Sequence, residues 1–211
     1  MTLTVSSLPV PRGILFDMDG TLVDSDDAVV RNWQAFAARH DLDADEIVTT
    51  CHGIPAVTTI RRFLPEASEE VIEHEYGLQV ELECTDLEGV HALPGASELL
   101  AYLDAAGIAW AVATSAGERL ARLRLGEANL PHRVLVSREM YEHGKPAPDA
   151  FLMAAERIGV PAEECWVVED SPAGLAAAEA SGGAVVNVGP GGTNLPALLA
   201  HLRALAARSL Q

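Results

Sequence analysis

Short apolar runs recur along the chain at a spacing that suits a layered α/β protein. They cover residues 13–19, where the apolar start ends in carboxylates, and residues 108–115, 133–137, 165–170 and 183–188. Within each run the apolar positions are continuous rather than alternating, which is typical of strands buried on both faces of a parallel sheet. We therefore predict a parallel strand in each segment.

Helical patterns fill the intervals between these runs. Residues 94–107 place Leu99, Leu100 and Leu103 at helical spacing and stop at a glycine, and residues 148–159 and 172–183 repeat that design. The alternation predicts an α/β fold with a Rossmann-like, doubly wound parallel sheet. After 183–188 the chain leads straight into a helical pattern over 197–205, so the presence of a last sheet strand stays open.

Residues 24–91 interrupt this rhythm. The stretch is acidic, shows no clear strand, and has helical spacings at Val29, Trp33 and Phe36 and again at Val71, Glu75, Leu78 and Leu82. We predict that residues 24–91 form a helical cap domain inserted into a core domain of residues 1–23 and 92–211.

Composition and charge exclude several classes of partner. Among the 211 residues, 14 Lys and Arg oppose 31 Asp and Glu, a net charge of −17 that disfavours nucleic-acid binding and anionic membrane surfaces. No apolar run reaches the ~20 residues of a membrane helix, and the start lacks a basic signal region. The three cysteines are far apart, which favours reduced structural thiols over zinc ligands. We expect a cytoplasmic protein that is a monomer, or else a dimer.

The strongest chemical signal is the string D-M-D-G-T-L-V-D-S at residues 17–25, directly after an apolar strand. At the carboxyl end of a central strand, Asp17 and Asp19 can face the crevice where ligands bind. Two close carboxylates repel each other unless a cation lies between them, and oxygen ligands favour a hard ion. The pattern predicts a Mg²⁺ site.

Two further strand ends carry polar groups. Glu169 and Asp170 end the run 165–170, and a neighbouring parallel strand would bring them to the same sheet edge as Asp17. Thr114 and Ser115 end another run, where a hydroxyl and backbone amides at a helix start can bind an anion. Taken alone, each pair is better interpreted as an ordinary helix cap.

Lys145, in the string G-K-P-A-P-D, is the only lysine in the chain; the 13 other cationic side chains are arginines. A compact ammonium suits the neutralisation of charge beside carboxylates and a phosphate group.

Together these motifs resemble the haloacid dehalogenase (HAD) superfamily of phosphohydrolases with a helical cap after the first strand. Four strings look most similar to bacterial sugar phosphatases of the hexitol and deoxyglucose phosphate type: H-G-I-P (52–55), L-P-G-A (93–96), A-V-A-T-S-A-G (111–117) and G-K-P-A-P-D-A-F (144–151). The resemblance implies Mg²⁺-dependent hydrolysis of small sugar or polyol phosphates, so the expected partner is a small phosphorylated metabolite.

The resemblance also implies a role for individual residues. Asp17 would be the nucleophile and Asp19 the general acid and base, while Thr114, Ser115 and Lys145 would bind phosphate. Asp17, Asp170 and the carbonyl of Asp19 would hold the metal, with Glu169 in support. The cap loop would contact the substrate through His52, Gly53 and Ile54.

The sequence argues against two other activities of the superfamily and leaves two alternatives. A dehalogenase does not need the acid at Asp19, and the phosphonate hydrolases use a cap lysine that this chain lacks. A phosphosugar mutase would use the same Asp17, although the cap start lacks the histidine that the mutases share. A non-catalytic ligand-sensing module is a third alternative.

Weaker signals have simpler interpretations. Arg61 and Arg62 suit a solvated helix face better than a phosphate contact, and Trp33 suits the cap core better than a sugar platform. Asp24 would cap the first cap helix or serve its hinge. We expect a solvated arginine face at Arg119, Arg122, Arg124 and Arg133.

Overall fold

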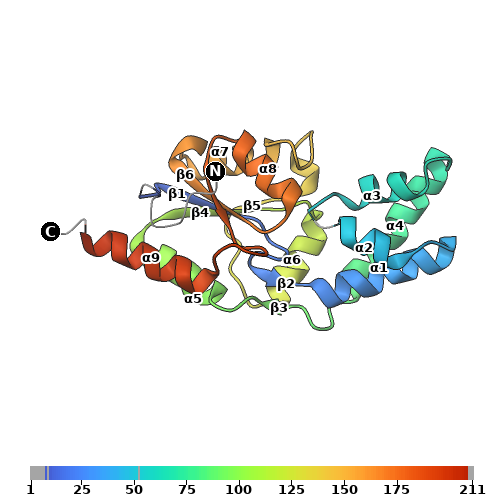
Figure 1. Ribbon diagram of the computed structural model, residues 1–211, viewed down its shortest axis with the longest axis horizontal. Coiled ribbons are helices and arrows are strands. Elements are labelled where there is room, and N and C mark those ends of the chain that lie inside the picture. Colours follow the sequence, from blue (N-terminus) through green and yellow to red (C-terminus); the bar gives the residue numbers. More distant parts are fainter. Residues whose placement is uncertain (1–7, 9, 52, 209–211) are drawn as a thin grey trace.

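The computed structural model describes residues 8, 10–51 and 53–208 and places a five-stranded parallel sheet at the centre of the molecule (Figure 1). The strand order is β5-β4-β1-β6-β7. The strands are β1 (Gly13–Phe16), β4 (Ala109–Ala113), β5 (Leu135–Val136), β6 (Cys165–Glu169) and β7 (Ala184–Asn187). Each lies within a run predicted from the sequence, and the α/β fold class is confirmed.

Helices cover both faces of this sheet. Ile14 and Phe16 of β1 pack into one apolar core with α5 (Ala96–Ala106), α6 (Glu118–Glu127) and α9 (Leu195–Arg208). Leu15 points the other way, into a second core with α7 (Asp149–Ile158) and α8 (Pro172–Ala180). Because successive side chains of a strand face opposite sides, both cores need apolar residues, which explains the continuous apolar runs.

The sequence left open whether a further strand follows residues 183–188, and the part of the chain that the structure describes contains none there. β7 forms the edge of the sheet beside β6, and residues 188–194 lead from it into α9. The sheet therefore ends at β7.

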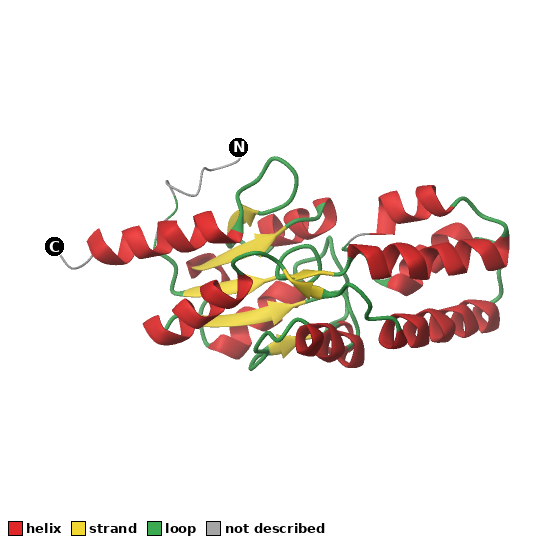
Figure 2. Ribbon diagram, turned by 90° about the horizontal axis from the view of Figure 1, so that it is seen from below, coloured by secondary structure: helices red, strands yellow, loops and turns green. Residues whose placement is uncertain are grey.

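Within the described residues, four helices of the predicted cap lie to one side of the sheet (Figures 1 and 2). These helices are α1 (Asp26–His40), α2 (Ala44–Cys51), α3 (Ala56–Phe63) and α4 (Glu69–Thr85). They have a core of their own, built on Trp33, Phe36, Ile47, Ile60 and Ile72. Trp33 and Phe36 pack edge to face with their ring centroids 5.4 Å apart. The division into the two predicted domains stays a prediction.

The chain crosses between sheet and cap twice, and the two crossings pair. β2 (Val23–Asp24) and β3 (His91–Ala92) are antiparallel, with Val23 opposite Ala92 and Asp24 opposite His91. The expectation of no strand in residues 24–91 was therefore wrong at both ends. Two extended segments that run side by side satisfy their backbone groups by pairing with each other.

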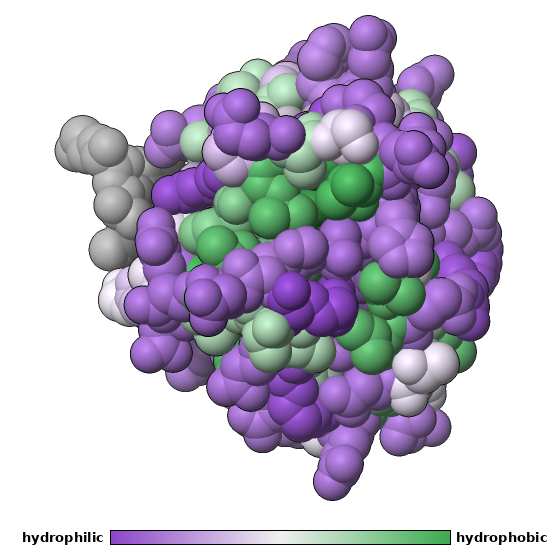
Figure 3. All heavy atoms as spheres, turned by 90° about the vertical axis from the view of Figure 1, so that its right-hand side faces the viewer, coloured by the Kyte–Doolittle hydropathy of each residue, from purple (hydrophilic) through white to green (hydrophobic). Residues whose placement is uncertain are grey.

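The residues that α4 buries also differ from those that its sequence pattern predicts to be buried. Val71 and Leu78 are 41% and 37% exposed, and the side of the molecule seen in Figure 3 is mainly hydrophilic with apolar patches between. The helix instead buries Ile72 together with three polar residues, Glu75, Gln79 and Glu83. Glu75 is paired with Arg39 of α1 at 2.8 Å, so burial of this carboxylate is compensated.

No helix within the described ranges is both long and apolar enough to cross a membrane. Cys51, Cys84 and Cys165 are buried and unpaired, as expected for structural thiols.

Candidate active site

The carboxyl ends of the central strands bring three acidic side chains together. Asp17 follows β1, Glu169 ends β6 and Asp170 comes next. Because β1 and β6 are parallel neighbours, these ends share one sheet edge. One carboxylate oxygen from each of the three residues lies within 4.8 Å of the other two.

Lys145 lies among these carboxylates. It comes from the loop before α7, its side chain is fully buried, and its ammonium contacts Asp17 and lies 2.6 Å from Oε2 of Glu169. The same ammonium lies 5.0 Å from the centroid of the Phe151 ring. The only lysine of the chain therefore neutralises carboxylates from two strands.

Burial and charge perturb every ionisable group of this cluster. Burial and the nearby Glu169 raise the pKa of Asp17 well above its usual range, although Lys145 opposes this. Burial would lower the pKa of Lys145, but Asp17 and Glu169 raise it above the ordinary lysine value. Burial would raise the pKa of Glu169, yet the attraction of Lys145 and local hydrogen bonds lower it.

Both carboxylate oxygens of Glu169 accept hydrogen bonds from groups of the protein itself. Oε1 accepts hydrogen bonds from the backbone N–H of Asp170 and from the N–H and hydroxyl of Ser171, each at 3.0 Å, and Oε2 accepts from Lys145. Ser171 also caps α8 by accepting from the N–H of Gly174. These contacts leave Asp17 and Asp170 as the carboxylates available to an external ligand.

Asp170 packs against the turn that follows β1. The Thr21 hydroxyl donates to its Oδ1 at 3.2 Å. Gly20 has φ +79°, and a Cβ there would lie 2.2 Å from Oδ2, so only glycine fits. Burial, and then the charge of Glu169, raises the pKa of Asp170 to about 7.

This donor set fits a hard divalent cation. Three carboxylates surround one ammonium, so the cluster holds excess negative charge, and repulsion by Glu169 adds to burial in raising the pKa values of Asp17 and Asp170. Oxygen-only ligands are those that Mg²⁺ and Ca²⁺ prefer. Asp17 and Asp170 would hold such an ion, and the residues present are compatible with it.

Asp19 lies beside this cluster and has different partners. The Ser25 hydroxyl donates to its Oδ1 at 2.7 Å, and Nη1 of Arg124 lies 2.9 Å from the same oxygen. Its side chain is 27% exposed. Asp19 is thus oriented by fixed donors while it remains accessible from the cavity.

The Arg124 contact corrects the expectation of a solvated arginine face. Arg119, Arg122 and Arg133 are exposed, as expected, but the Arg124 side chain is only 5% exposed. It lies on the buried stripe of α6 with Leu120, Ala121 and Leu125. The i, i+1, i+4, i+5 spacing of that stripe is the signal that could have identified Arg124 as buried.

Thr114 and Ser115 lie on the same side of the cavity as Asp17. Oγ1 of Thr114 accepts from the N–H of Ala116 at 3.0 Å. The Thr114 carbonyl accepts from the hydroxyl of Tyr141 at 2.9 Å. The Ser115 hydroxyl donates to the carbonyl of Gly53 in the cap at 3.1 Å. Ser115 therefore joins the sheet edge to the cap loop.

The cap loop closes over these residues at close range. Gly53 has φ +73°, and a Cβ there would lie 2.3 Å from the hydroxyl of Ser171. Gly53 and Ile54 both line the cavity, whereas His52 lies outside the described residues.

A cavity of about 150 Å³ separates the sheet edge from the cap. Its walls include Asp17, Asp19, Thr114 and Ser115 on the sheet side, and Trp33, Ile54, Tyr76 and Glu83 on the cap side. Trp33 is thus a core residue, as expected, whose surface also reaches the cavity.

Two minor expectations concern polar residues of the cap. Arg61 and Arg62 are exposed, and Arg61 pairs with Glu69 at 2.5 Å, as expected for a solvated face. Oδ1 of Asp24 accepts from the N–H of Asp26, the first residue of α1.

The fold and the acidic cavity define a doubly wound α/β hydrolase with a helical cap. The chain belongs to the haloacid dehalogenase-like hydrolase family, whose model matches residues 11–182.

Relatives of known name support this membership. The chain is 45% identical to hexitol phosphatase A of Escherichia coli (strain K12), over 84% of this chain and 82% of that protein. It is 30% identical to glycerol-1-phosphate phosphohydrolase 1 of Saccharomyces cerevisiae, over 89% and 79% respectively. A hydrolase from Pseudomonas syringae has a similar structure, with a TM-score of 0.77, 30% identity and coverage of 84% and 83%.

Proposed function

We propose that this protein is a Mg²⁺-dependent phosphomonoesterase for small sugar or polyol phosphates. The observation that carries the proposal is the buried cluster of Asp17, Lys145, Glu169 and Asp170 at a sheet edge, from which Asp17, together with Asp19, lines a cavity under the cap.

Asp17 is the nucleophile in this proposal. Its carboxylate oxygen forms a bond to phosphorus while the bond from phosphorus to the ester oxygen breaks, which gives an aspartyl phosphate. The contact with Lys145 keeps the carboxylate in place, and Asp17 lines the cavity from which the substrate would approach.

Asp19 moves the protons of both steps. It gives a proton to the departing alcohol oxygen and later takes one from the water that attacks the aspartyl phosphate. That second attack breaks the bond from phosphorus to Asp17 and releases inorganic phosphate. Ser25 and Arg124 hold Asp19 at the cavity wall, where both transfers take place.

The remaining residues bind and neutralise the phosphate group. Lys145 supplies one positive charge at Asp17, and Thr114 lies on the same wall. A Mg²⁺ ion held by Asp17 and Asp170 would stabilise charge on the transferring oxygens. Over the few ångströms of this buried site these charges outweigh the net charge of −17, most of which is distant and screened.

The substrate class is inferred from the relatives and from the cavity. The named relatives act on hexitol and glycerol phosphates, and a cavity of about 150 Å³ suits a molecule of that size. Gly53 and Ile54 of the cap loop lie on its wall and would face the substrate, with His52 as a further candidate.

Phosphate release tests the proposal directly. Purified protein with Mg²⁺ should hydrolyse members of a panel of sugar and polyol phosphates, and Asp17→Asn and Asp19→Ala should each lower the rate at least ~10²-fold. Asp45→Asn, an exposed change on α2, is the matched control and should retain full activity. Unchanged turnover in both site variants would defeat the proposal.

Product analysis separates the alternatives. An isomerised phosphosugar without free phosphate would indicate a mutase, and absence of any phosphoenzyme would indicate a non-catalytic module. We also propose that the protein is cytoplasmic, which its three buried, unpaired thiols support because they suit a reducing compartment, and that it is a monomer or else a dimer.

A further inference from the structure

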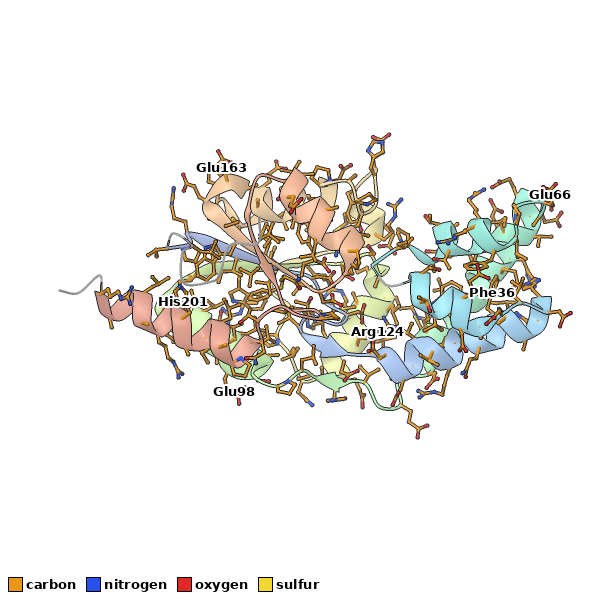
Figure 4. All side chains as sticks on the ribbon, viewed as in Figure 1. Phe36, Glu66, Glu98, Arg124, Glu163 and His201 are labelled. Atoms are coloured by element: carbon orange, nitrogen blue, oxygen red, sulfur yellow. The ribbon has the colours of Figure 1, made fainter. Side chains whose placement is uncertain are left out.

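A buried arginine lies at the junction between the sheet and the cap (Figure 4). Arg124 extends from α6, and its Nη1 atom pairs with Asp19. Its Nε and Nη2 atoms are buried and have no hydrogen-bond partner among the described residues. Buried donors without an acceptor are costly, so these two atoms point to an acceptor supplied from outside the chain.

The cap helix α4, which packs against α6, supplies a buried carboxylate to the same cavity. Glu83 is 8% exposed and, among the described residues, accepts a hydrogen bond from Nε2 of Gln79 at 3.3 Å. The Oε1 atom of Gln79 is buried without a partner in the described part of the chain. Burial raises the pKa of Glu83, while the attraction of Arg124 opposes the rise, so the two charges are within electrostatic reach.

These groups together select for a particular kind of ligand. A hydroxyl both donates and accepts, so adjacent hydroxyls on one molecule can accept from Arg124 and donate to Glu83. A carboxylate or second phosphate could pair with Arg124, but Glu83 and Asp19 would repel it. Neutral, polyhydroxylated groups therefore match this wall better than anionic ones.

We propose that Arg124 and Glu83 form a subsite that binds vicinal hydroxyls of the leaving alcohol and determines specificity for neutral polyol and sugar phosphates. This rests on the proposed phosphatase function and adds the chemistry by which the substrate is recognised. Because Arg124 also pairs with Asp19, the subsite lies beside the residue that protonates the leaving oxygen. The cavity is smaller than the roughly 300–1,000 Å³ of drug-sized sites, in keeping with a short alcohol.

The first test uses the unaltered protein and four phosphate monoesters. Glycerol 3-phosphate should exceed both propyl phosphate, which lacks the hydroxyls, and phosphoglycolate, which carries a carboxylate, by at least about 10-fold in kcat/KM. p-Nitrophenyl phosphate reports the phosphatase reaction alone. If it is hydrolysed while the other three are used equally well, the subsite proposal fails and the proposed function stands. If none of the four is hydrolysed, the proposed function fails, and the subsite with it.

The second test uses variants on the two sides of the cavity. Glu83→Gln and Arg124→Lys should each lower the ratio of kcat/KM for glycerol 3-phosphate to that for propyl phosphate about 10-fold, because both substrates need the same acid and only the first carries the hydroxyls. Glu83→Gln should also raise the corresponding ratio for phosphoglycolate, because the repelling charge is gone. Glu73→Gln, the same change at an exposed position of α4, is the control and should leave every ratio unchanged. Unchanged ratios in both folded subsite variants would overturn the proposal.

Discussion

The ammonium of Lys145 lies 2.6 Å from Oε2 of Glu169, and both side chains are fully buried. The same ammonium contacts Asp17, which follows the neighbouring strand. One cation thus holds together the ends of β1 and β6. The lysine therefore serves both the stability of the sheet edge and the chemistry proposed for it.

Lys145→Met should damage both stability and activity. Removing one member of a buried charge network leaves the other charges uncompensated, which costs about 3–5 kcal/mol of unfolding free energy. We expect a loss of that size in urea denaturation at pH 7 and at least ~10²-fold slower phosphate release. Arg61→Met, which breaks an exposed ion pair, is the control and should change stability little. Equal stability of the two variants would contradict this account of Lys145.

Gly174→Ala and Gly77→Ala should have opposite effects on stability. A Cβ at Gly174 would lie 1.9 Å from Oε2 of Glu169, so the first turn of α8 or the carboxylate must move. Gly77 lies within α4, and apart from the neighbouring backbone of that helix no atom of the described residues lies within 4 Å of its Cβ position, so alanine should stabilise the helix by roughly 0.5–1 kcal/mol.

Thermal unfolding and phosphate release measured on both glycine variants test this contrast. Gly174→Ala should have a lower melting temperature and much slower turnover, whereas Gly77→Ala should melt higher with unchanged turnover. A Gly174→Ala protein as active as the parent would show that α8 does not fix Glu169.

Asp170 should make the metal-free protein less stable as the pH rises. Its folded pKa is raised to about 7, whereas the unfolded value is near 3.8. Between these values the folded state binds the proton more tightly than the unfolded state, so stability falls as pH increases. Asp170→Asn lacks this pH-dependent contribution to the free energy of unfolding. Its advantage over the parent protein in EDTA should grow from pH 4 to pH 7 and then level off. An advantage that is constant with pH would refute the assignment.

Divalent cations should reverse that loss of stability. Chelation should abolish phosphate release, and Mg²⁺ at a hundredfold excess over its Kd should stabilise the parent protein by about 2.7 kcal/mol through mass action. Asp170→Asn should show a much smaller rise in melting temperature on addition of Mg²⁺. Equal stabilisation of both proteins would place the cation elsewhere.

The close approach of the site residues at one sheet edge could be predicted from sequence for a simple geometric reason. Asp17, Thr114 and Asp170 each follow an apolar run, and the carboxyl ends of adjacent parallel strands share one edge of a sheet. Lys145 was identified by composition, since it is the only lysine. These inferences need only the strand assignment and no knowledge of how the cap is placed.

The roles of Arg124 and Glu83 could not be predicted in the same way. Both are charged residues on helices, and such residues are usually solvated. They are buried because α4 of the cap packs against α6 of the core, a contact between elements that belong to different layers. We expected Arg124 on a solvated face, although the stripe through Leu120, Ala121 and Leu125 could have indicated its burial; that stripe does not reveal its partner Asp19.

The most direct test of the central claim is the detection of a phosphoryl group on Asp17 during turnover. The protein is mixed with Mg²⁺ and a polyol phosphate, quenched in acid within milliseconds to seconds, digested and examined by mass spectrometry. We predict a phosphorylated peptide that contains Asp17, absent from the Asp17→Asn protein. Normal phosphate release with no adduct on Asp17, or with the adduct on another residue, would contradict the account.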